Sequence, residues 1–400
     1  LCDLAISDKK ACVGKRNVMM AGFRDYNLDK YINKIQKNNY TTVVYSQDEK
    51  AAGTTRSLTG IYSPGTYFSN NTEKLNNNIV CIWIKRFHRN VIIGLSNIDI
   101  YTGKSHIYEY MTPYSNSPQP YDELERFISI FNPSEIIIIA NVDEIDLIVN
   151  YAGIKTECIH KINIEKDKTT MSTRAVNCEK QTYQKEIIKS FFEESIFDHG
   201  DFLENNIATQ SFCFLLDFIY QHNPNLIRKI NIPLFENCSD RLILANHSLK
   251  QLNMISCDDN HGKLSSVSKF LNNCITCMGQ RRFNIQLMNP VKNVDFLNQE
   301  YSITKHILEN QPIDEVRNKL NLMRDIEKLN RKLILKKITP YDFYHFSQNL
   351  QEIEGLFVKL IEDQQIATYL KNYIKYPVNE FCRKLIGDIK HIFILNKINE

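Results

Sequence analysis

Apolar residues at helical spacing dominate the second half of this chain, and they restrict its fold more than any other feature. The segments 294–309, 314–336, 341–360 and 381–398 each repeat apolar residues at positions i, i+3, i+4 and i+7. Most of these stripes have no strand signal between them. The sequence therefore predicts an all-helical domain with long helices over residues 181–400.

The first 70 residues mix strand and helix signals. Residues 29–35 have apolar positions at helical spacing, and the β-branched run 41–45 indicates a strand. A second strand is expected over 58–62, closed by the turn Ser63-Pro64-Gly65. The pattern predicts a small mixed α/β domain over 1–70.

A second α/β pattern follows. Residues 79–84 and 91–95 predict one hairpin, and 98–101 with 105–110 predict another around a Thr-Gly-Lys turn. A helix over 121–131, stopped by Asn132-Pro133, should lead into a buried strand at 135–140. The polar segments 70–78 and 166–180 are predicted as linkers. The fold class is then multidomain α/β plus all-α, with domains at 1–70, 71–170 and 181–400.

Composition excludes some functional classes. With 43% hydrophobic and 24% charged residues the chain can bury sizeable cores, and it holds no run of 18 apolar residues that would indicate a membrane span. A net charge of +3 does not by itself indicate nucleic acid, although a DNA-binding protein can gather its Lys and Arg on one face.

The start of the chain and its cysteines bear on location. The chain begins Leu1-Cys2-Asp3, without Met and without a signal peptide, so we expect an internal start. Eleven scattered cysteines form no paired framework, which favours a reducing intracellular compartment. Organelle, nucleus and virus-associated locations all stay open.

The stretch 271–291, LNNCITCMGQRRFNIQLMNPV, is the most specific pattern in the sequence. Thr276 is placed to cap a following helix, Gly279 permits close backbone approach and Pro290 ends the helix. A buried Arg281 would need a carboxylate or carbonyl partner. We therefore assign structural roles to one set of residues: Thr276, Met278, Gly279, Arg281 and Pro290.

This stretch resembles the signature of the core domain of the MutS family of DNA mismatch repair proteins, T-x-T-x-M-G-x-R followed by a hydrophobic helix and P-[LV]; Cys274 replaces the first Thr. Other stretches are similar to that family, in the family's order, among them 242–254, which resembles its T-x-x-N-L-E-L stretch. The others are 18–23 with 63–66 (mismatch-recognition domain), 93–104 (connector hairpin), 321–329 (the L-x-x-x-x-D-L-E-R-L helix) and 338–343 (the entry to the next helix).

The resemblance covers most of the chain and implies three parts. They are a partial mismatch-recognition domain, an RNase H-like α/β connector and a core or lever domain with the start of a clamp. It also implies a divergent member, of viral or organellar type, that binds mismatched double-stranded DNA as a homodimer or heterodimer and couples binding to an ATPase.

The ATPase itself is expected outside this chain, because no G-x-x-x-x-G-K-[ST] occurs. ATP and Mg²⁺ would then belong to the parent protein, and these 400 residues would hold no cofactor and no enzyme activity. Two departures keep another hypothesis open. Arg24-Asp25-Tyr26 replaces the family's P-x-H, and residues 1–20 lack its Phe-x-Glu. The alternative is a catalytically silent MutS-derived scaffold that mediates protein–protein assembly.

Basic residues in the segment similar to the mismatch domain are candidate DNA contacts, because Lys and Arg there can neutralise phosphates. They are Lys9, Lys10, Lys15, Arg16 and Arg56. The alternative is an ordinary solvated charged face. For a second basic run on a long helix, the solvated face is the preferred interpretation. That run comprises Lys328, Arg331, Lys332, Lys336 and Lys337.

Two further sites fit the sequence less well. Cys257, His261, Cys274 and Cys277 form C-x3-H-x12-C-x2-C, a zinc spacing. The resemblance, however, places Thr at the first of the CxxC cysteines and needs no metal, so we predict no metal site; thiol redox chemistry is a further alternative. An RNase H-like fold also suggests a nuclease, but Asp99 has no second acid clearly beside it, and a turn-capping role is preferred.

Overall fold

The computed structural model describes residues 2–13, 16–47, 55–69, 74–193, 196–197, 200–236, 241–242, 246–254 and 262–393. Contacts between residues divide the chain into two units, Leu1–Phe235 (unit 1) and Glu236–Glu400 (unit 2). The first is mixed α/β and the second is helical, so the predicted fold class is confirmed. The three predicted domain ranges stay predictions.

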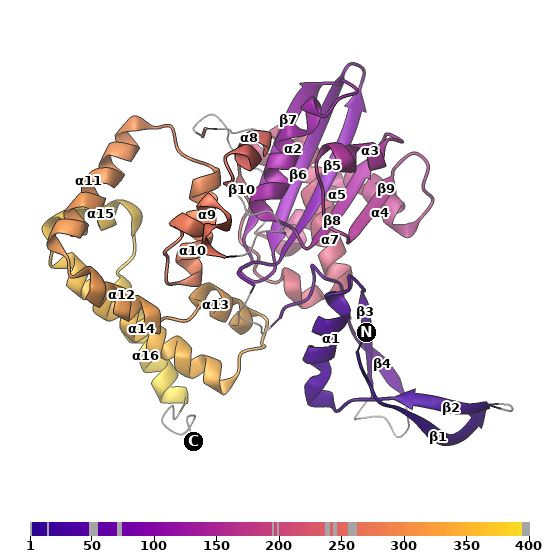
Figure 1. Ribbon diagram of the computed structural model, residues 1–400, viewed down its shortest axis with the longest axis horizontal. Coiled ribbons are helices and arrows are strands. Elements are labelled where there is room, and N and C mark those ends of the chain that lie inside the picture. The colour runs from indigo at the N-terminus through magenta and orange to yellow at the C-terminus, as the bar shows by residue number, and fades with distance from the viewer. Residues whose placement is uncertain are drawn as a thin grey trace. The chain divides into compact units, whose positions relative to one another are not determined.

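Unit 1 begins with two antiparallel ribbons separated in sequence by a short helix. Strand β1 (Ile6–Val13) pairs with β2 (Arg16–Ala21), and β3 (Thr42–Gln47) pairs with β4 (Arg56–Tyr62). Between them lie η1 (Asp25–Asn27) and α1 (Leu28–Gln36), which buries Ile32. The β1–β2 ribbon projects away from the six-stranded sheet (Figure 1). The helix and strands predicted over 29–62 are confirmed.

A six-stranded sheet in the order β10-β7-β6-β5-β8-β9 forms the centre of unit 1. Its strands are β5 (Asn78–Phe87), β6 (Asn90–Asp99), β7 (Ser105–Pro113), β8 (Glu135–Ala140), β9 (Ile159–Asn163) and β10 (Leu234–Phe235). Strands β5, β6 and β7 pair antiparallel, while β8 pairs parallel to β5 and β9 parallel to β8. Three antiparallel strands followed by two parallel ones fit the RNase H-like connector that the resemblance implies. Residues 98–101 do not form a separate strand, because β6 continues to Asp99 in register with β7.

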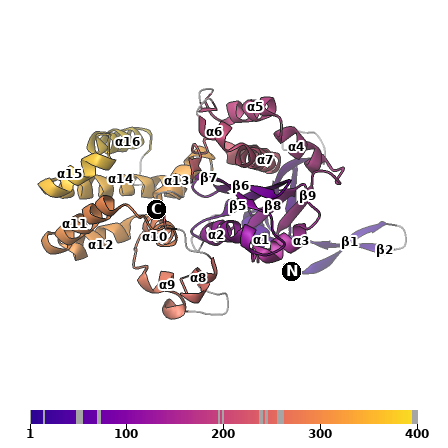
Figure 2. The same cartoon turned by 90° about the horizontal axis from the view of Figure 1, so that it is seen from above.

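Helices cover both faces of this sheet (Figure 2). They are η2 (Gln119–Tyr121), α2 (Asp122–Phe131), α3 (Ile145–Tyr151), α4 (Thr170–Cys178), α5 (Gln181–Phe191), α6 (Gly200–Glu204), α7 (Asn206–His222) and η4 (Pro224–Ile227). Strand β8, Glu-Ile-Ile-Ile-Ile-Ala, is buried along its whole length, as a strand covered on both faces should be. Helix α7 begins so close to β6 that a Cβ on Gly94 would lie 2.4 Å from the backbone nitrogen of Ala208.

Both predicted linkers are wrong in part. Within 166–180 the structure has helix α4, begun by a capping box in which Thr169 and Ser172 bond each other's backbone N–H. In 70–78, residues 70–73 lie outside the described residues, while Asn77 and Asn78 are buried. The side chain of Asn77 donates to the carbonyls of Pro64, Gly65 and Tyr67. These polar residues look like linkers because their side chains bond backbone groups instead of forming an apolar stripe.

The described part of unit 2 is built mainly of helices. They are α8 (Asn246–Gln251), η6 (Lys263–Ser265), α9 (Val267–Leu271), α10 (Cys277–Met288), α11 (Val294–Asn310), α12 (Ile313–Leu322), α13 (Ile326–Ile334), α14 (Pro340–Ile361), α15 (Gln364–Tyr373) and α16 (Val378–Ile392). Helix α14 packs along α16 around Leu350, Cys382, Ile386 and Ile389. The predicted helix over 314–336 is wrong as one element, because it is broken at 323–325.

Candidate nucleic-acid interface

The candidate DNA contacts lie on the two N-terminal ribbons. Lys9 and Lys10 belong to β1, and Arg16 opens β2 opposite Val13. Arg56 opens β4 opposite Gln47, and its side chain is exposed. Lys15 lies outside the described residues. The structure thus places four candidates on paired strands, two of them in the neighbourhood of a bulge between Lys9 and Cys12.

Large apolar side chains are exposed on the same ribbons. On the β3–β4 ribbon, Val43, Tyr45 and Leu58 are each at least half exposed. Met19 and Met20 on β2 are also exposed. Large apolar groups exposed together on a surface are typical of a surface that contacts another molecule. These exposed groups cannot be predicted from the sequence, because an alternating strand does not reveal which of its faces stays uncovered.

The core motif forms the start of helix α10 in unit 2. Thr276 is its N-cap, and the Oγ1 of Thr276 accepts from the backbone N–H of Gly279 at 3.1 Å. A Cβ on Gly279 would lie 3.0 Å from that same oxygen and 3.3 Å from Cys274 Cβ. The helix ends at Met288, before Pro290. The side chain of Met278 is half-buried.

Arg281 of α10 holds the next motif in place. Its guanidinium donates from Nη1 and Nη2 to the two carboxylate oxygens of Asp325, both at 2.7 Å. Nη2 and Nε also donate to Oε2 of Glu327, at 2.6 and 3.1 Å. Only 6% of Arg281 is exposed. We call these three residues the arginine clamp; the motifs at 271–291 and 321–329 meet in it.

The arginine clamp keeps its charges despite burial. Burial disfavours the charged guanidinium, but the hydrogen bonds and charges of Asp325 and Glu327 outweigh that cost, so the pKa of Arg281 is raised above its ordinary value. A fork-to-fork pair with Asp325 fixes direction as well as distance. One feature of the sequence points to these partners: a buried arginine needs carboxylates, and the second motif contains Asp-x-Glu.

The break between α12 and α13 is held by polar groups. Asp325 caps α13 by accepting from the N–H of Lys328, besides binding Arg281. Asn349 of α14 accepts from the N–H of Arg324 at 3.0 Å and donates to its carbonyl at 3.1 Å. Helical periodicity runs through 323–325, but these bonds stabilise the bent connection instead.

The second basic run is the solvated face that the sequence predicts only at Lys336 and Lys337, which are exposed. Lys328 and Arg331 are buried, Arg331 with 1% of its surface exposed. Lys332 pairs with Asp342 of α14 at 2.9 Å. These three cations are therefore committed within the protein, which removes them as phosphate contacts.

Asp99 serves a turn. Its Oδ1 accepts from the backbone N–H of Asn77 at 2.9 Å and of Tyr101 at 3.0 Å, and its Oδ2 accepts from Thr102 Oγ1 at 2.7 Å. A carboxylate with this many donors stabilises the turn between β6 and β7. The structure thus supports turn capping over the nuclease interpretation.

The zinc-like spacing of Cys257, His261, Cys274 and Cys277, which the sequence disfavours as a metal site, is only partly within the described residues. Cys257 and His261 lie outside the described residues, and Cys274 and Cys277 are free thiols, each half-buried. Within the described part of the chain, neither cysteine joins a group of three possible metal ligands.

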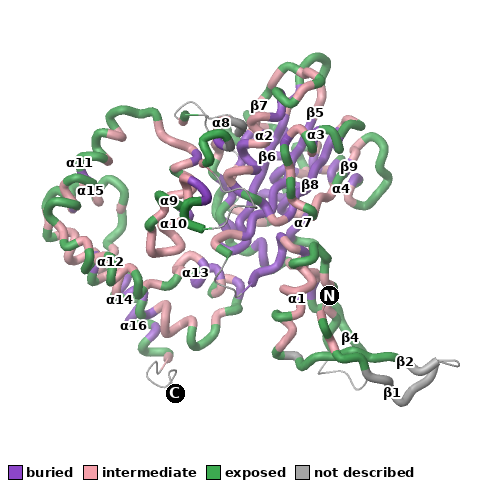
Figure 3. Tube along the Cα trace, in the orientation of Figure 1, coloured by how far each residue is buried: buried purple, intermediate pink, exposed green. Residues whose placement is uncertain are grey.

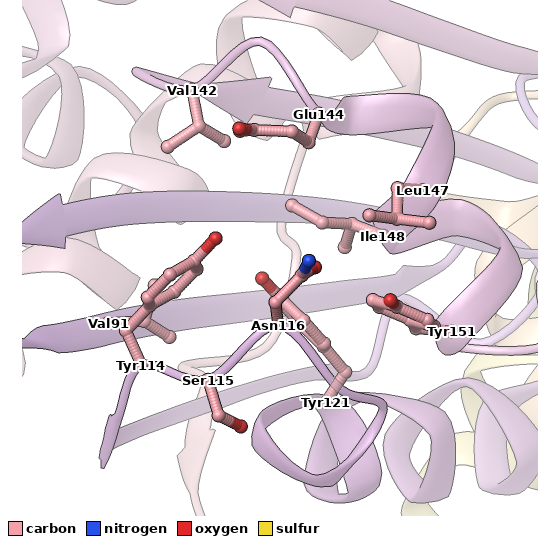
Figure 4. A pocket seen from close by; sticks show the side chains of 10 residues that line it. All are labelled: Val91, Tyr114, Ser115, Asn116, Tyr121, Val142, Glu144, Leu147, Ile148 and Tyr151. Atoms are coloured by element: carbon pink, nitrogen blue, oxygen red, sulfur yellow. The ribbon is translucent and has the colours of Figure 1, made fainter.

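A pocket at the end of the sheet in unit 1 is too small for a ligand. Figure 4 shows Tyr114, Tyr121 and Tyr151 around it, with Glu144 on the opposite wall. Its volume is about 10 Å³, room for one water molecule. The guanidinium of Arg86 lies 3.7 Å from the ring centre of Tyr114. This region is a packed aromatic corner.

Comparisons with known proteins match both ends of the chain. A model of MutS domain I matches residues 1–71, and a model of MutS domain III matches residues 247–391. None of the described helices combines the length and apolarity needed to cross a membrane.

Curated relatives extend the match across the residues between those two regions. A DNA mismatch repair protein mutS homologue of Acanthamoeba polyphaga mimivirus is 24% identical over 88% of this chain and 34% of its own length. The DNA mismatch repair protein MutS of Caldanaerobacter subterraneus is 23% identical over 96% of this chain and 43% of its own. The mitochondrial mutS homologue of Sarcophyton glaucum is 23% identical, over 96% and 41%. The chain thus spans less than half the length of these relatives.

Proposed function

Because the chain belongs to the MutS family of DNA mismatch repair proteins, we propose that it binds double-stranded DNA containing a mismatch. The observation that carries this proposal is the match to relatives named for mismatch repair over 88–96% of the chain. In this proposal the ribbons of unit 1 contact DNA. Unit 2 passes the resulting rearrangement to an ATPase domain of the intact protein, which acts as a homodimer or heterodimer in a reducing compartment of the cell.

Physical features of the ribbons support DNA contact. A two-stranded β-ribbon has the dimensions of the DNA major groove. Lys9, Lys10, Arg16 and Arg56 on such ribbons would neutralise phosphates and release counterions. The exposed apolar groups beside them would contact the sugars and bases.

We propose no catalytic activity for these 400 residues. Asp99 is engaged in a turn, and the sequence contains no G-x-x-x-x-G-K-[ST]. ATP and Mg²⁺ would act in a domain that these residues do not contain, as the lengths of the relatives allow.

Fluorescence anisotropy with matched duplexes, one fully paired and one with a single G·T mismatch, tests the proposal. We expect tighter binding to the mismatch and an affinity that falls with salt, by a slope of about 0.9 for each phosphate contact. The test variant replaces the described candidates by Gln: Lys9, Lys10, Arg16 and Arg56. The control variant removes the same charge from exposed lysines elsewhere: Lys168, Lys375, Lys384 and Lys390. Only the test variant should flatten the salt slope; equal slopes in both variants would reject the ribbons as the interface.

A scaffold that only assembles proteins is the second candidate. It is favoured by Arg24-Asp25-Tyr26, where the family has P-x-H; here these residues lead into α1 and leave Tyr26 exposed. The scaffold predicts no salt-dependent DNA binding in the same titration. Equal affinity for the two duplexes would retain DNA binding but reject mismatch recognition.

A further inference from the structure

A buried carboxylate, a thiol and an imidazole meet at the edge of the six-stranded sheet in unit 1. The carboxylate of Glu135, the Sγ of Cys158 and a ring nitrogen of His160 all lie within 4.8 Å of one another. We propose that these three side chains bind one Zn²⁺ ion. We call them the Glu-Cys-His cluster.

The backbone of the sheet brings these residues together. Glu135 opens β8, and Ile136 of β8 lies opposite Ile159 of the parallel strand β9. Cys158 and His160 flank Ile159, so they share one face of the strand, and Glu135 faces the same way from the neighbouring strand. The backbone N–H of Ile136 donates to the carbonyl of Cys158 at 3.0 Å, which fixes this register. The ligands are thus set by paired strands instead of loops.

The donor set selects the metal. One sulfur, one nitrogen and one oxygen ligand suit Zn²⁺, whereas Ca²⁺ and Mg²⁺ take oxygen ligands. A tetrahedral zinc with bonds of about 2.0–2.3 Å requires its ligand atoms about 3.4 Å apart. The Nε2 of His160 now lies 2.7 Å from Oε1 of Glu135, so modest side-chain rotation would open room for the ion. Water would take the fourth position.

The cluster is chemically ready for a cation. Burial opposes ionisation of Glu135, but hydrogen bonds from His160 and Ser63 outweigh it and lower the pKa of that carboxyl. Burial first, and then the adjacent Glu135 charge, raises the pKa of Cys158 to about 12. The thiol therefore stays protonated without a metal, and zinc would displace its proton to bind the thiolate.

A zinc ion could reach the cluster from solvent, and its binding would link neighbouring parts of unit 1. The side chain of His160 is 32% exposed, while that of Glu135 is fully buried. The other carboxylate oxygen of Glu135, Oε2, accepts from Ser63 Oγ at 2.5 Å and from the N–H of Gly65 at 3.0 Å. An ion on the Oε1 side would leave those bonds intact. It would tie the edge strand β9 to β8 and to the turn after β4.

Cobalt titration of the purified, untagged and chelator-treated protein tests the site. We expect one equivalent of Co²⁺ to bind, with a thiolate-to-cobalt charge-transfer band and the strong visible bands of a four-coordinate ion. Zn²⁺ should displace it and raise the unfolding midpoint reported by Trp83 fluorescence. Absence of the charge-transfer band in the wild type would overturn the proposal.

Variants locate the ion. Cys158→Ser should abolish the charge-transfer band, and His160→Gln should keep a band but weaken affinity by at least about tenfold. The double variant Cys274→Ser/Cys277→Ser is the matched control, since it removes the CxxC and should leave the spectrum unchanged. A band that survives Cys158→Ser, or that vanishes in the control, rejects the Glu-Cys-His cluster. If Cys158→Ser does not fold by circular dichroism, His160→Gln and the control still decide.

Discussion

Strand β8 of unit 1 buries every one of its residues, whereas helix α12 of unit 2 buries none. Figure 3 shows the same difference, with buried residues massed in the sheet and scattered among the helices of unit 2. The described residues of unit 2 include one small apolar cluster, around Leu350 and Ile386, and several buried or half-buried polar contacts between helices. The arginine clamp, the Asn349 bonds and the Lys332–Asp342 pair are such contacts.

This difference bears on mechanics. A core buried on both faces resists deformation because any shift opens cavities or creates clashes. Helices joined by a few polar contacts, with little apolar burial, open at lower free energy. Unit 1 is therefore suited to holding a fixed surface, and unit 2 to changing shape.

The largest expected effect tests how much apolar burial contributes to the stability of unit 1. Phe127 of α2 is fully buried beside the sheet, so Phe127→Ala should leave a cavity and lower the free energy of unfolding of unit 1 by about 4 kcal/mol. Trp83, the single tryptophan, lies in β5, and its fluorescence in urea reports this unit. Phe87→Ala, at an exposed position of the same strand, is the control and should cost much less. Equal losses would show that burial does not set the stability of unit 1.

A somewhat smaller effect tests how much the arginine clamp contributes to the stability of unit 2. Arg281→Met leaves the carboxylates of Asp325 and Glu327 without their cation, and should destabilise unit 2 by about 3 kcal/mol. Circular dichroism should record the loss, while the Trp83 transition stays in place. Arg282→Met, at the exposed neighbouring position, should change little. If Arg281→Met shifts the Trp83 transition as much as the helical one, the two units do not unfold independently.

The smallest effect concerns pH and unit 1 alone. Burial first, and Lys104 second, lower the pKa of His106 in β7 to about 4. Since the unfolded histidine titrates near its ordinary pKa of about 6.5, the unfolded state binds more protons between these values. Stability should therefore fall as pH drops from about 6.5 to 4, by on the order of 2 kcal/mol after allowing for the partial exposure of His106. His106→Gln should flatten the pH dependence of the urea midpoint in this window; an unchanged profile would assign the dependence to other groups.

Local sequence signals succeeded where one pattern dominated. The bounds of strand β8 agree with the prediction, because an uninterrupted run of Ile residues favours a buried strand. Helix α2 agrees with its prediction because Asn132-Pro133 ends it. Thr276 capping α10 follows from residues three apart in sequence. Such features depend on neighbours along the chain, which the sequence displays directly.

Local sequence patterns gave wrong predictions where a residue distant in the sequence determines the structure. The helix break at 323–325 depends on Asn349, which lies 25 residues away, and the helix in the supposed linker packs against α7. Lys328 and Arg331 belong to a charged run that is solvated in most helices, but packing buries them here. The Glu-Cys-His cluster could not be predicted from the sequence, because Glu135 lies in an apolar strand and its partners lie at the next strand of the sheet.

The sequence by itself determined the family, the α/β and helical halves, and the roles of residues whose partners lie within one turn. Only the tertiary structure decided which charges are buried, since that depends on what packs over them. It paired Arg281 with Asp325 across 44 residues and brought Glu135 to His160 across 25. A charged group that is removed from water needs a partner inside the protein. Burial therefore makes each of these pairs a contact that links two elements of the fold.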